Sequence, residues 1–414
     1  MNQFTRTPIG EPPPTPVPPP LPAKLDFTGD RNSFLHLVAR GAGLELVTLG
    51  FYRFWLVTDI RRHLWSNTVI DGDAAEYTGR GRELLIGFLI ALAILVPIYL
   101  AYFLISIEAE HLRALASIPL VAAFYVFGQF AIFRARRYRL TRTVWRGVRF
   151  WMTGSGWVYA AQSSLWLLVA VVTFGLAWPW RAAALERYKM EHSWYGDLQG
   201  RFEGSGRVFF ERIWWLWLGV FALIALFVIP LVFKQTWWLW VALLMVSLAF
   251  PLLPFVYAYY KAVEWRWWIS GIRFGEVRLE STLRSGAFQG LYWKVIGWYM
   301  LLSTVFAAVI GAAVGLVTKI SVTKISGAPA EQVSVAAAAS SSIPLLVVTV
   351  IGYLALALAL SVVTRLYLTR DLWARVLHTT VVTNIAAAAN VAAKGEPASA
   401  VGEGIADGLD VAGF

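Results

Sequence analysis

The chain has no cysteine and few charged residues, and each of these absences limits the classes of protein to which it can belong. Without cysteine there is no disulfide, no thiolate nucleophile and no cysteine-ligated metal. Charged residues make up 15% of the 414 positions, against about 25% in an ordinary soluble domain, whereas apolar residues make up 58%. This composition excludes a soluble enzyme as the default interpretation.

The common catalytic motifs are also missing. The five histidines are scattered and form no HExxH or other metal-ligand spacing. No nucleophile elbow and no phosphate-binding glycine loop occurs. The net charge of +11 comes with no nucleic-acid-binding motif, so basic loops beside a membrane explain it better. We predict that the protein is not an enzyme, and we assign it no catalytic residue, no metal site, no cofactor and no nucleic-acid partner.

The N-terminal region lacks the apolar stretch of a signal peptide. Residues 8 to 22 instead contain nine prolines, a composition that favours an extended polyproline II tether. We therefore predict a disordered proline-rich cytoplasmic tail over residues 1–24. A membrane domain over residues 25–383 and an Ala/Gly-rich cytoplasmic tail over residues 384–414 would follow it.

Long apolar segments are abundant. Residues 84 to 105 run for 22 positions without a charge, and about 20 apolar residues are enough to cross a bilayer as a helix. Two weaker segments, 32 to 55 and 157 to 180, begin with polar residues and end in aromatics. The strong segments are residues 84 to 105, 117 to 133, 213 to 233, 237 to 260, 290 to 317 and 342 to 364.

Internal similarity relates these segments to one another. A shift of 125 residues places Thr173, Gly175 and Trp180 on the equivalent residues of the first weak segment without a gap. Shifts of 75 and 79 relate further copies, and a fifth, diverged copy runs from Arg365 to Thr380. Each copy has an apolar segment, a basic and aromatic helix end and a short polar stretch. We predict internal repeats.

The polar stretch of each copy has the pattern of a β-hairpin. In the first copy Asp71-Gly72 stands between two short runs, and Asp-Gly suits a two-residue type I′ turn because glycine tolerates positive φ. In the second copy residues 148 to 153 alternate with the period of two that is typical of a strand. We therefore predict small β-hairpins on the cytoplasmic side of a helical membrane body.

The distribution of basic residues decides between two topologies. If the two weak segments are re-entrant or lie in the interface, the inner loops hold 26 Lys and Arg and the outer loops hold 4. If all eight segments span, the bias disappears. The sequence thus predicts an all-α polytopic membrane protein with six core transmembrane helices, two re-entrant or interfacial segments and cytoplasmic N- and C-termini.

Two kinds of residue are candidates for function. Glu45 and Arg53 lie in a segment that enters the membrane, where ionisable groups are costly and often handle ions or protons. A second set lies where helices leave the inner face and could bind anionic lipid headgroups. It consists of Arg61, Arg62, Arg136, Arg137, Arg187 and Arg266.

The opening of the membrane domain resembles the YjgN-like bacterial inner-membrane proteins, the domain-of-unknown-function 898 family. The resemblance lies in Phe27-Thr28-Gly29, Thr48-Leu49-Gly50-Phe51-Tyr52, Arg61-Arg62-His63 and Asn67-Thr68-Val69-Ile70-Asp71-Gly72. Two positions depart from the family pattern, Phe51 for isoleucine and His63 for tyrosine. The resemblance implies a multi-pass protein of the bacterial inner membrane and carries over no catalytic residue.

Two hypotheses for function follow. The first is transport or passage of a small molecule or lipid, because repeats around a polar, interrupted membrane segment are typical of transporters. The alternative is a non-catalytic scaffold or regulator that binds anionic lipid or a membrane partner on its basic cytoplasmic face. Membrane lipids are the partners expected under both hypotheses, and the sequence identifies no protein partner.

Overall fold

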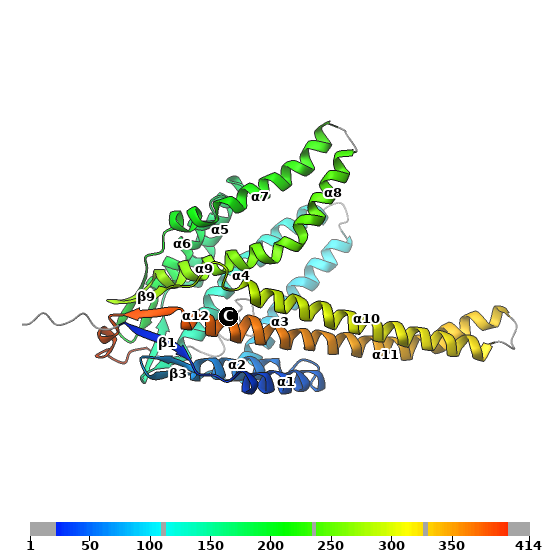
Figure 1. Ribbon diagram of the computed structural model, residues 1–414, viewed down its shortest axis with the longest axis horizontal. Coiled ribbons are helices and arrows are strands. Elements are labelled where there is room, and N and C mark those ends of the chain that lie inside the picture. The colour runs from blue at the N-terminus through cyan, green and yellow to red at the C-terminus, as the bar shows by residue number, and fades with distance from the viewer. Residues whose placement is uncertain (1–21, 109–112, 234–236, 326–329, 396–414) are drawn as a thin grey trace, which may run out of the picture.

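A single order of elements recurs along the chain. The computed structural model describes residues 22–108, 113–233, 237–325 and 330–395. Within these residues, a strand, an outgoing helical segment, a returning helical segment and a second strand follow one another five times (Figure 1). We call each such set a unit. The common order of elements does not by itself test the predicted sequence repeats, which stay a prediction.

The units differ mainly in helix length. Unit 1 consists of β1 (Ala23–Phe27), α1 (Arg31–Val47), α2 (Arg53–Ser66) and β2 (Thr68–Ile70). Unit 2 consists of β3 (Asp73–Tyr77), α3 (Gly81–Glu108), α4 (Arg113–Thr141) and β4 (Thr143–Trp145). Unit 3 consists of β5 (Val148–Met152), α5 (Gly156–Val172), α6 (Trp178–Glu191) and β6 (Ser193–Tyr195).

The last two units contain interrupted helices. Unit 4 consists of β7 (Leu198–Phe202), α7 (Gly206–Phe233), α8 (Trp237–Ala249), the 3₁₀ turn η2 (Phe250–Leu252), α9 (Leu253–Gly271) and β8 (Ile272–Phe274). Unit 5 consists of β9 (Val277–Ser281), α10 (Gln289–Ile325), α11 (Ala330–Thr364), the π-helical turn η3 (Arg365–Asp371), α12 (Leu372–His378) and β10 (Thr380–Thr383). A 3₁₀ turn, η4 (Ile385–Ala388), follows.

The ten strands form one closed antiparallel barrel in which consecutive strands are neighbours. Two-residue turns join the strands of successive units. In the first turn Asp71 has φ 52° and Gly72 has φ 86°, which confirms the predicted left-handed turn at Asp-Gly. The barrel closes where the first and last strands pair, with Ala23 opposite Val382 and Lys24 opposite Val381.

The predicted all-α fold class is therefore wrong. The hairpins predicted at the unit boundaries do form, but they are not separate elements beside a helical body, because each hairpin pairs with the next to complete the barrel. The sequence could not show this pairing. Strands of three to five residues have too few alternating positions to specify a neighbour, and each pair of neighbouring hairpins is separated in the chain by two or more helices.

The inside of the barrel is filled by apolar side chains. Trp145 and Tyr195 are buried with ring centroids 5.6 Å apart, and Phe150 lies 4.7 Å from the same tyrosine ring. The Tyr195 hydroxyl donates to the Trp145 carbonyl oxygen at 3.0 Å, so the polar end of this buried ring is satisfied. Ile385, in the segment that follows β10, packs against the same core.

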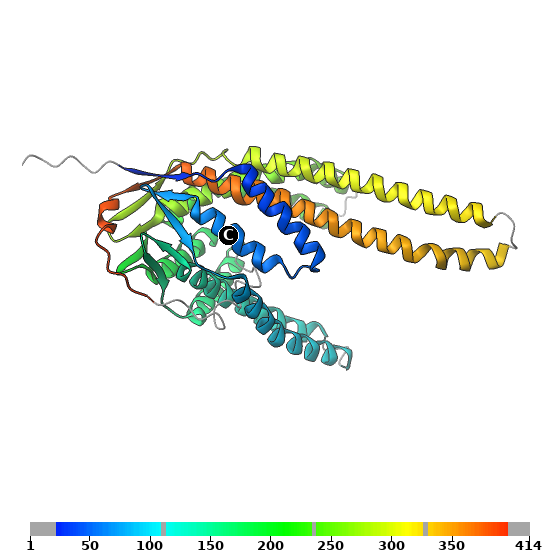
Figure 2. The ribbon, with the colours of Figure 1, turned by 90° about the horizontal axis from the view of Figure 1, so that it is seen from below.

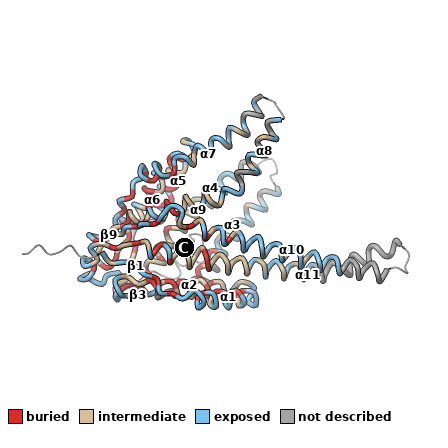
Figure 3. Tube along the Cα trace, viewed as in Figure 1, coloured by how far each residue is buried: buried red, intermediate tan, exposed pale blue. Residues whose placement is uncertain are grey.

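All five pairs of helical segments project from the same end of the barrel. Figures 1 and 2 show them extending away from the strands, with α10 and α11 reaching farthest. Buried residues gather around the barrel and the adjoining helix ends, whereas exposed residues follow the projecting segments (Figure 3). Exposed apolar side chains along these segments are expected when lipid, rather than protein, covers them.

In the described part of the chain, five helices are long and apolar enough to cross a membrane. By length and composition they mark the chain as a membrane protein. Six were predicted, and the difference lies in residues 237 to 260, where η2 separates α8 from α9. Prolines at positions 251 and 254 lack the backbone N–H that a continuous helix needs. The candidate spans are Gly81–Leu104, Ile118–Thr141, Gly206–Leu226, Gln289–Leu316 and Leu346–His378.

The two weaker segments form short helical pairs that turn back. Helices α1 and α2 reverse direction at Leu49-Gly50, and α5 and α6 do so at Phe174-Gly175, with both residues of each pair at positive φ. Leu49 is 85% exposed and Phe174 is 79% exposed. Both pairs return to the barrel, and the depth that these apolar tips reach in a membrane stays a prediction.

The predicted tails lie largely outside the described residues. Residues 1–21 and 396–414 are not described, and β1 begins at Ala23, within the predicted N-terminal tail. Residues 384 to 395 of the predicted C-terminal tail are described, and Ile385, Ala388 and Val391 among them pack against the core of the barrel.

Candidate functional site at the barrel rim

A common hydrogen bond marks the junction between helix and strand. In four units the first residue of the short strand is Thr or Ser, and its hydroxyl donates to the carbonyl oxygen four residues earlier, at 2.7 to 2.9 Å. Because the bond identifies the equivalent strand-start residue in each of these units, positions in different units can be numbered from it and compared. The four hydroxyl donors are Thr68, Thr143, Ser193 and Thr380.

Arginines recur six residues before the start of the short strand. Four units have arginine at this position, and the fifth has Ala374. Arg62, Arg187 and Arg266 are exposed, so three of the four guanidinium groups face outward near the barrel. We refer to the four as the rim arginines: Arg62, Arg137, Arg187 and Arg266.

The residue before each rim arginine has a different environment. Arg61 is 1% exposed, and its Nη1 donates to the Tyr77 hydroxyl at 3.3 Å. The Arg136 Nη1 donates to the Glu186 carboxylate at 2.9 Å. The sequence predicts that both arginines of each Arg-Arg pair bind lipid headgroups. Consecutive residues of a helix point about 100° apart, however, so only one arginine of each pair is directed outward.

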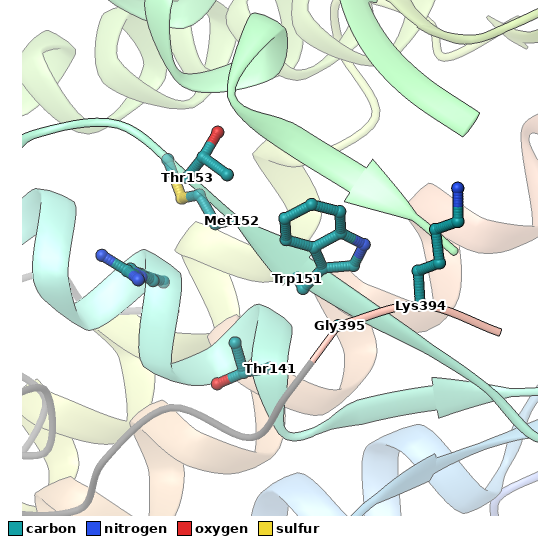
Figure 4. Close-up of a pocket in the computed structure, with 7 residues that line it drawn as sticks. Thr141, Trp151, Met152, Thr153, Lys394 and Gly395 are labelled. Atoms are coloured by element: carbon teal, nitrogen blue, oxygen red, sulfur yellow. The ribbon is translucent and has the colours of Figure 1, made fainter. Parts of the chain in front are cut away.

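Arg137 lines a pocket of about 330 Å³ on the outside of the barrel. The pocket lies where the end of α4, the end of β5 and the C-terminal segment meet, and Figure 4 shows Trp151 and Lys394 on neighbouring parts of its wall. Among the residues that the structure describes, its lining includes two cationic side chains and no carboxylate. The lining residues are Arg137, Thr141, Trp151, Met152, Thr153, Lys394 and Gly395.

The C-terminal segment is held in place at Gly395. This residue has φ 100°, and a Cβ there would lie 2.5 Å from the Trp151 ring, so only glycine allows this close approach. The Trp151 Nε1 donates to the Gly196 carbonyl oxygen at 2.7 Å, which fixes the indole. Among the described residues, Lys394 forms no hydrogen bond or ion pair, and its ammonium group therefore keeps all three donors for a ligand.

Arg136 belongs to a buried ion cluster between α4, α6 and α9. The Glu186 carboxylate accepts from Arg136, from Lys189 and, at 3.0 Å, from the Trp268 Nε1. Burial alone would raise the pKa of Glu186, but the neighbouring Lys189 and Arg136 charges and the hydrogen bonds outweigh it and lower the pKa to about 2. The carboxylate is thus ionised at neutral pH, and Arg136 is committed to it.

Glu45 is also paired, but not with Arg53. Its carboxylate lies 3.2 Å from the Nη2 of Arg365, which belongs to the π-helical turn η3 of the last unit. The Arg53 guanidinium instead lies 5.5 Å from the ring centroid of Phe54. The role of Glu45 and Arg53 in ion or proton handling stays a prediction, and in this structure Glu45 joins the first unit to the last.

Sequence reasoning missed several residues of the pocket. Trp151 was visible only as part of an alternating strand, and Lys394 lies 243 positions from it in the chain, so no local pattern could link the two. Among the described residues, no group of three or more His, Asp or Glu side chains could hold a metal ion.

Comparisons with known proteins identify the family of the chain. No curated protein and no solved structure matches the chain. A family model described as a bacterial protein of unknown function (DUF898) matches residues 22–408, nearly the whole chain. The chain therefore belongs to the DUF898 family, the YjgN-like family, as its opening motifs indicated.

Proposed function

We propose that the protein is a non-catalytic membrane scaffold or regulator that binds anionic phospholipid at the cytoplasmic rim of its barrel. The pocket beside Arg137 carries this proposal, because its described lining has two cations and an indole face and includes no carboxylate. A phosphate group offers several acceptor oxygens to such a set of donors. Cytoplasmic leaflets of bacterial inner membranes would supply the anionic lipid.

The position of the rim arginines supports the same proposal. They lie within two helical turns of the barrel, at the end from which all the candidate spans project. If the spans cross a bilayer, this is the level of the headgroups, where each basic residue gains about 1 kcal/mol from an anionic surface. Trp151 suits the same level, since indole rings favour the membrane interface.

The geometry gives less support to passage through the molecule. The barrel interior is packed with aromatic and aliphatic side chains, among them Trp145, Phe150 and Tyr195. Every unit also returns to the barrel on one side, whereas alternating access commonly relies on repeats of opposite orientation. These observations favour the scaffold hypothesis over the transport hypothesis.

The test compares lipids that co-purify with the wild type and with Arg137→Gln/Lys394→Gln. Native mass spectrometry in mild detergent, with phosphatidylglycerol and phosphatidylcholine added in turn, would count bound lipids. We expect the double variant to lose phosphatidylglycerol adducts roughly tenfold, the effect of removing charge-assisted hydrogen bonds, with no change for phosphatidylcholine.

A matched control removes the same charge elsewhere. Arg278 is an exposed arginine on β9, one residue from the turn at the far end of the barrel, so Arg278→Gln should leave phosphatidylglycerol binding unchanged. An equal loss of phosphatidylglycerol adducts in Arg278→Gln would show that binding depends only on net charge and not on the pocket. An unchanged adduct count in the Arg137/Lys394 variant would refute the pocket as a lipid site.

A further inference from the structure

A polar network lies among α4, α5 and α6, away from the rim pocket. The Nη2 of Arg181 donates to the Ser163 Oγ at 2.8 Å and to the Tyr125 hydroxyl at 3.1 Å. Ser163 is fully buried, and its hydroxyl donates to the Gln129 Oε1 at 2.8 Å. The Arg181 guanidinium lies 4.6 Å from the ring centroid of Trp178.

This network lies at membrane depth. Tyr125 and Gln129 occupy the middle of the candidate span Ile118–Thr141. Arg181 precedes the first residue of β6 by 12 positions, so it lies roughly 18 Å along the helix from the barrel at 1.5 Å per residue. The rim arginines lie roughly 9 Å from the barrel by the same measure, so Arg181 lies roughly 9 Å deeper than the headgroup level and within a hydrocarbon core about 30 Å thick. A cation there is costly, and function is its usual explanation.

The partners of Arg181 within the network are all neutral. Among the described residues, Arg181 forms no ion pair, and its Nε is buried without an acceptor. The Gln129 amide nitrogen also donates no hydrogen bond within that part of the chain. The network therefore has a full positive charge and unused donors but lacks a counterion. Such a surplus of donors matches an anionic group.

The first unit shows that the fold does not need this network. Under the shift of 125 residues the helix bounds coincide, α1 with α5 and α2 with α6. Arg181 then corresponds to Leu56 and Ser163 to Val38, which are 1% and 0% exposed. In unit 1 apolar side chains fill the equivalent position, so the fold does not require the charged side chain that unit 3 has there.

We propose that Arg181 and Gln129, both held in place by Ser163, bind the acidic group of a single-chain amphiphile, a carboxylate or a phosphate monoester, within the membrane. Apolar surface for the chain of such a ligand is adjacent, since Val121 lies one helical turn before Tyr125 on α4 and is 66% exposed. This site shares no residue with the rim pocket and does not depend on it.

Unit 1 also supplies the substitutions for the test. Arg181→Leu/Ser163→Val copies Val38 and Leu56, so the variant should keep its unfolding temperature while losing the site. Native mass spectrometry would count adducts of palmitate, methyl palmitate and 1-oleoyl-lysophosphatidate on the wild type and the variant. We expect at least one acidic probe to bind the wild type and to lose occupancy roughly tenfold in the variant, while the uncharged ester does not bind specifically.

The outcomes separate the two ligand sources and the two sites. If only palmitate binding depends on Arg181, the acidic group of the ligand is a carboxylate. If only lysophosphatidate binding depends on Arg181, it is a phosphate. Arg137→Gln/Lys394→Gln should retain this binding, whatever happens to phosphatidylglycerol at the rim. The proposal fails if a folded Arg181→Leu/Ser163→Val variant binds both acids as the wild type does, or if methyl palmitate competes equally.

Discussion

Arg136 and Glu186 lie 2.9 Å apart and occupy the same position in successive units. Each stands seven residues before the hydroxyl-bearing residue that begins the short strand, Thr143 in unit 2 and Ser193 in unit 3. Two units with the same backbone plan are thus joined through opposite charges at equivalent positions. The side chains are only 18% and 16% exposed, so the contact is little screened by solvent.

Removing the Glu186 charge should destabilise the protein strongly. Glu186→Gln leaves Arg136 and Lys189 buried side by side without a counterion, and breaking a buried pair in this way costs about 3 kcal/mol. The midpoint of thermal unfolding, followed by size-exclusion chromatography in detergent, should fall by several degrees. Glu211→Gln is the control, because Glu211 is 57% exposed in its pair with Arg207 and should change the midpoint little. A Glu186→Gln midpoint equal to that of the wild type would contradict a stabilising cluster.

The Glu186 carboxylate should also make the stability of the protein depend on pH in the acidic range. The pKa of Glu186 is about 2 in the folded protein and 4.5 for a glutamate without these interactions, as in the unfolded chain. The unfolded chain therefore binds the proton more readily. The contribution of Glu186 to stability is therefore fully present above pH 4.5 and is lost as the pH falls from 4.5 towards 2. Unfolding midpoints measured from pH 6 to pH 3 should fall more steeply for the wild type than for Glu186→Gln. Parallel curves would show that another group controls the acid response.

A double-mutant cycle should show whether Glu45 and Arg365 stabilise the contact between the first and last units. Glu45→Gln removes the partner of Arg365 and should cost about 2 kcal/mol of the free energy of unfolding, since the Glu45 side chain is only 7% exposed. Arg365→Gln should have a similar effect, and the double variant should lose less than the sum of the two. Additive losses would mean that the pair has no coupling energy and would return Glu45 to the candidates for ion handling.

Cysteine labelling should place all unit boundaries on one side of the membrane. The chain has no native cysteine, and Ser66, Ser155, Ser205 and Thr282 are exposed residues close to the barrel. Single cysteines at these positions should all resist an impermeant thiol reagent in intact cells and all react after permeabilisation. Reaction at only some of them in intact cells would be incompatible with a barrel that carries every pair of helical segments on one side.

Local sequence patterns were sufficient for the turns and for most helices. Asp71-Gly72 specified a left-handed turn because glycine accepts positive φ without strain, and the observed φ values of 52° and 86° follow from that chemistry. Long apolar runs specified helices because the backbone must satisfy its own hydrogen bonds in lipid. Both rules depend only on residues that are close together in the chain.

Only the tertiary structure decided the barrel, the ion pairs and the candidate sites. Pairing of β1 with β10 joins residues more than 350 positions apart, and nothing in a strand of five residues encodes its partner. The same holds for Glu45, which lies in an apolar segment with Arg53 nearby in sequence but meets Arg365 from the far end of the chain. The amino-acid sequence by itself determined the membrane character, the turns and the family. The closure of five similar units into one ring decided which described charges form ion pairs with one another and which, like Lys394 and Arg181, form none among the described residues. Ring closure does this because it sets distances that local chain geometry leaves open.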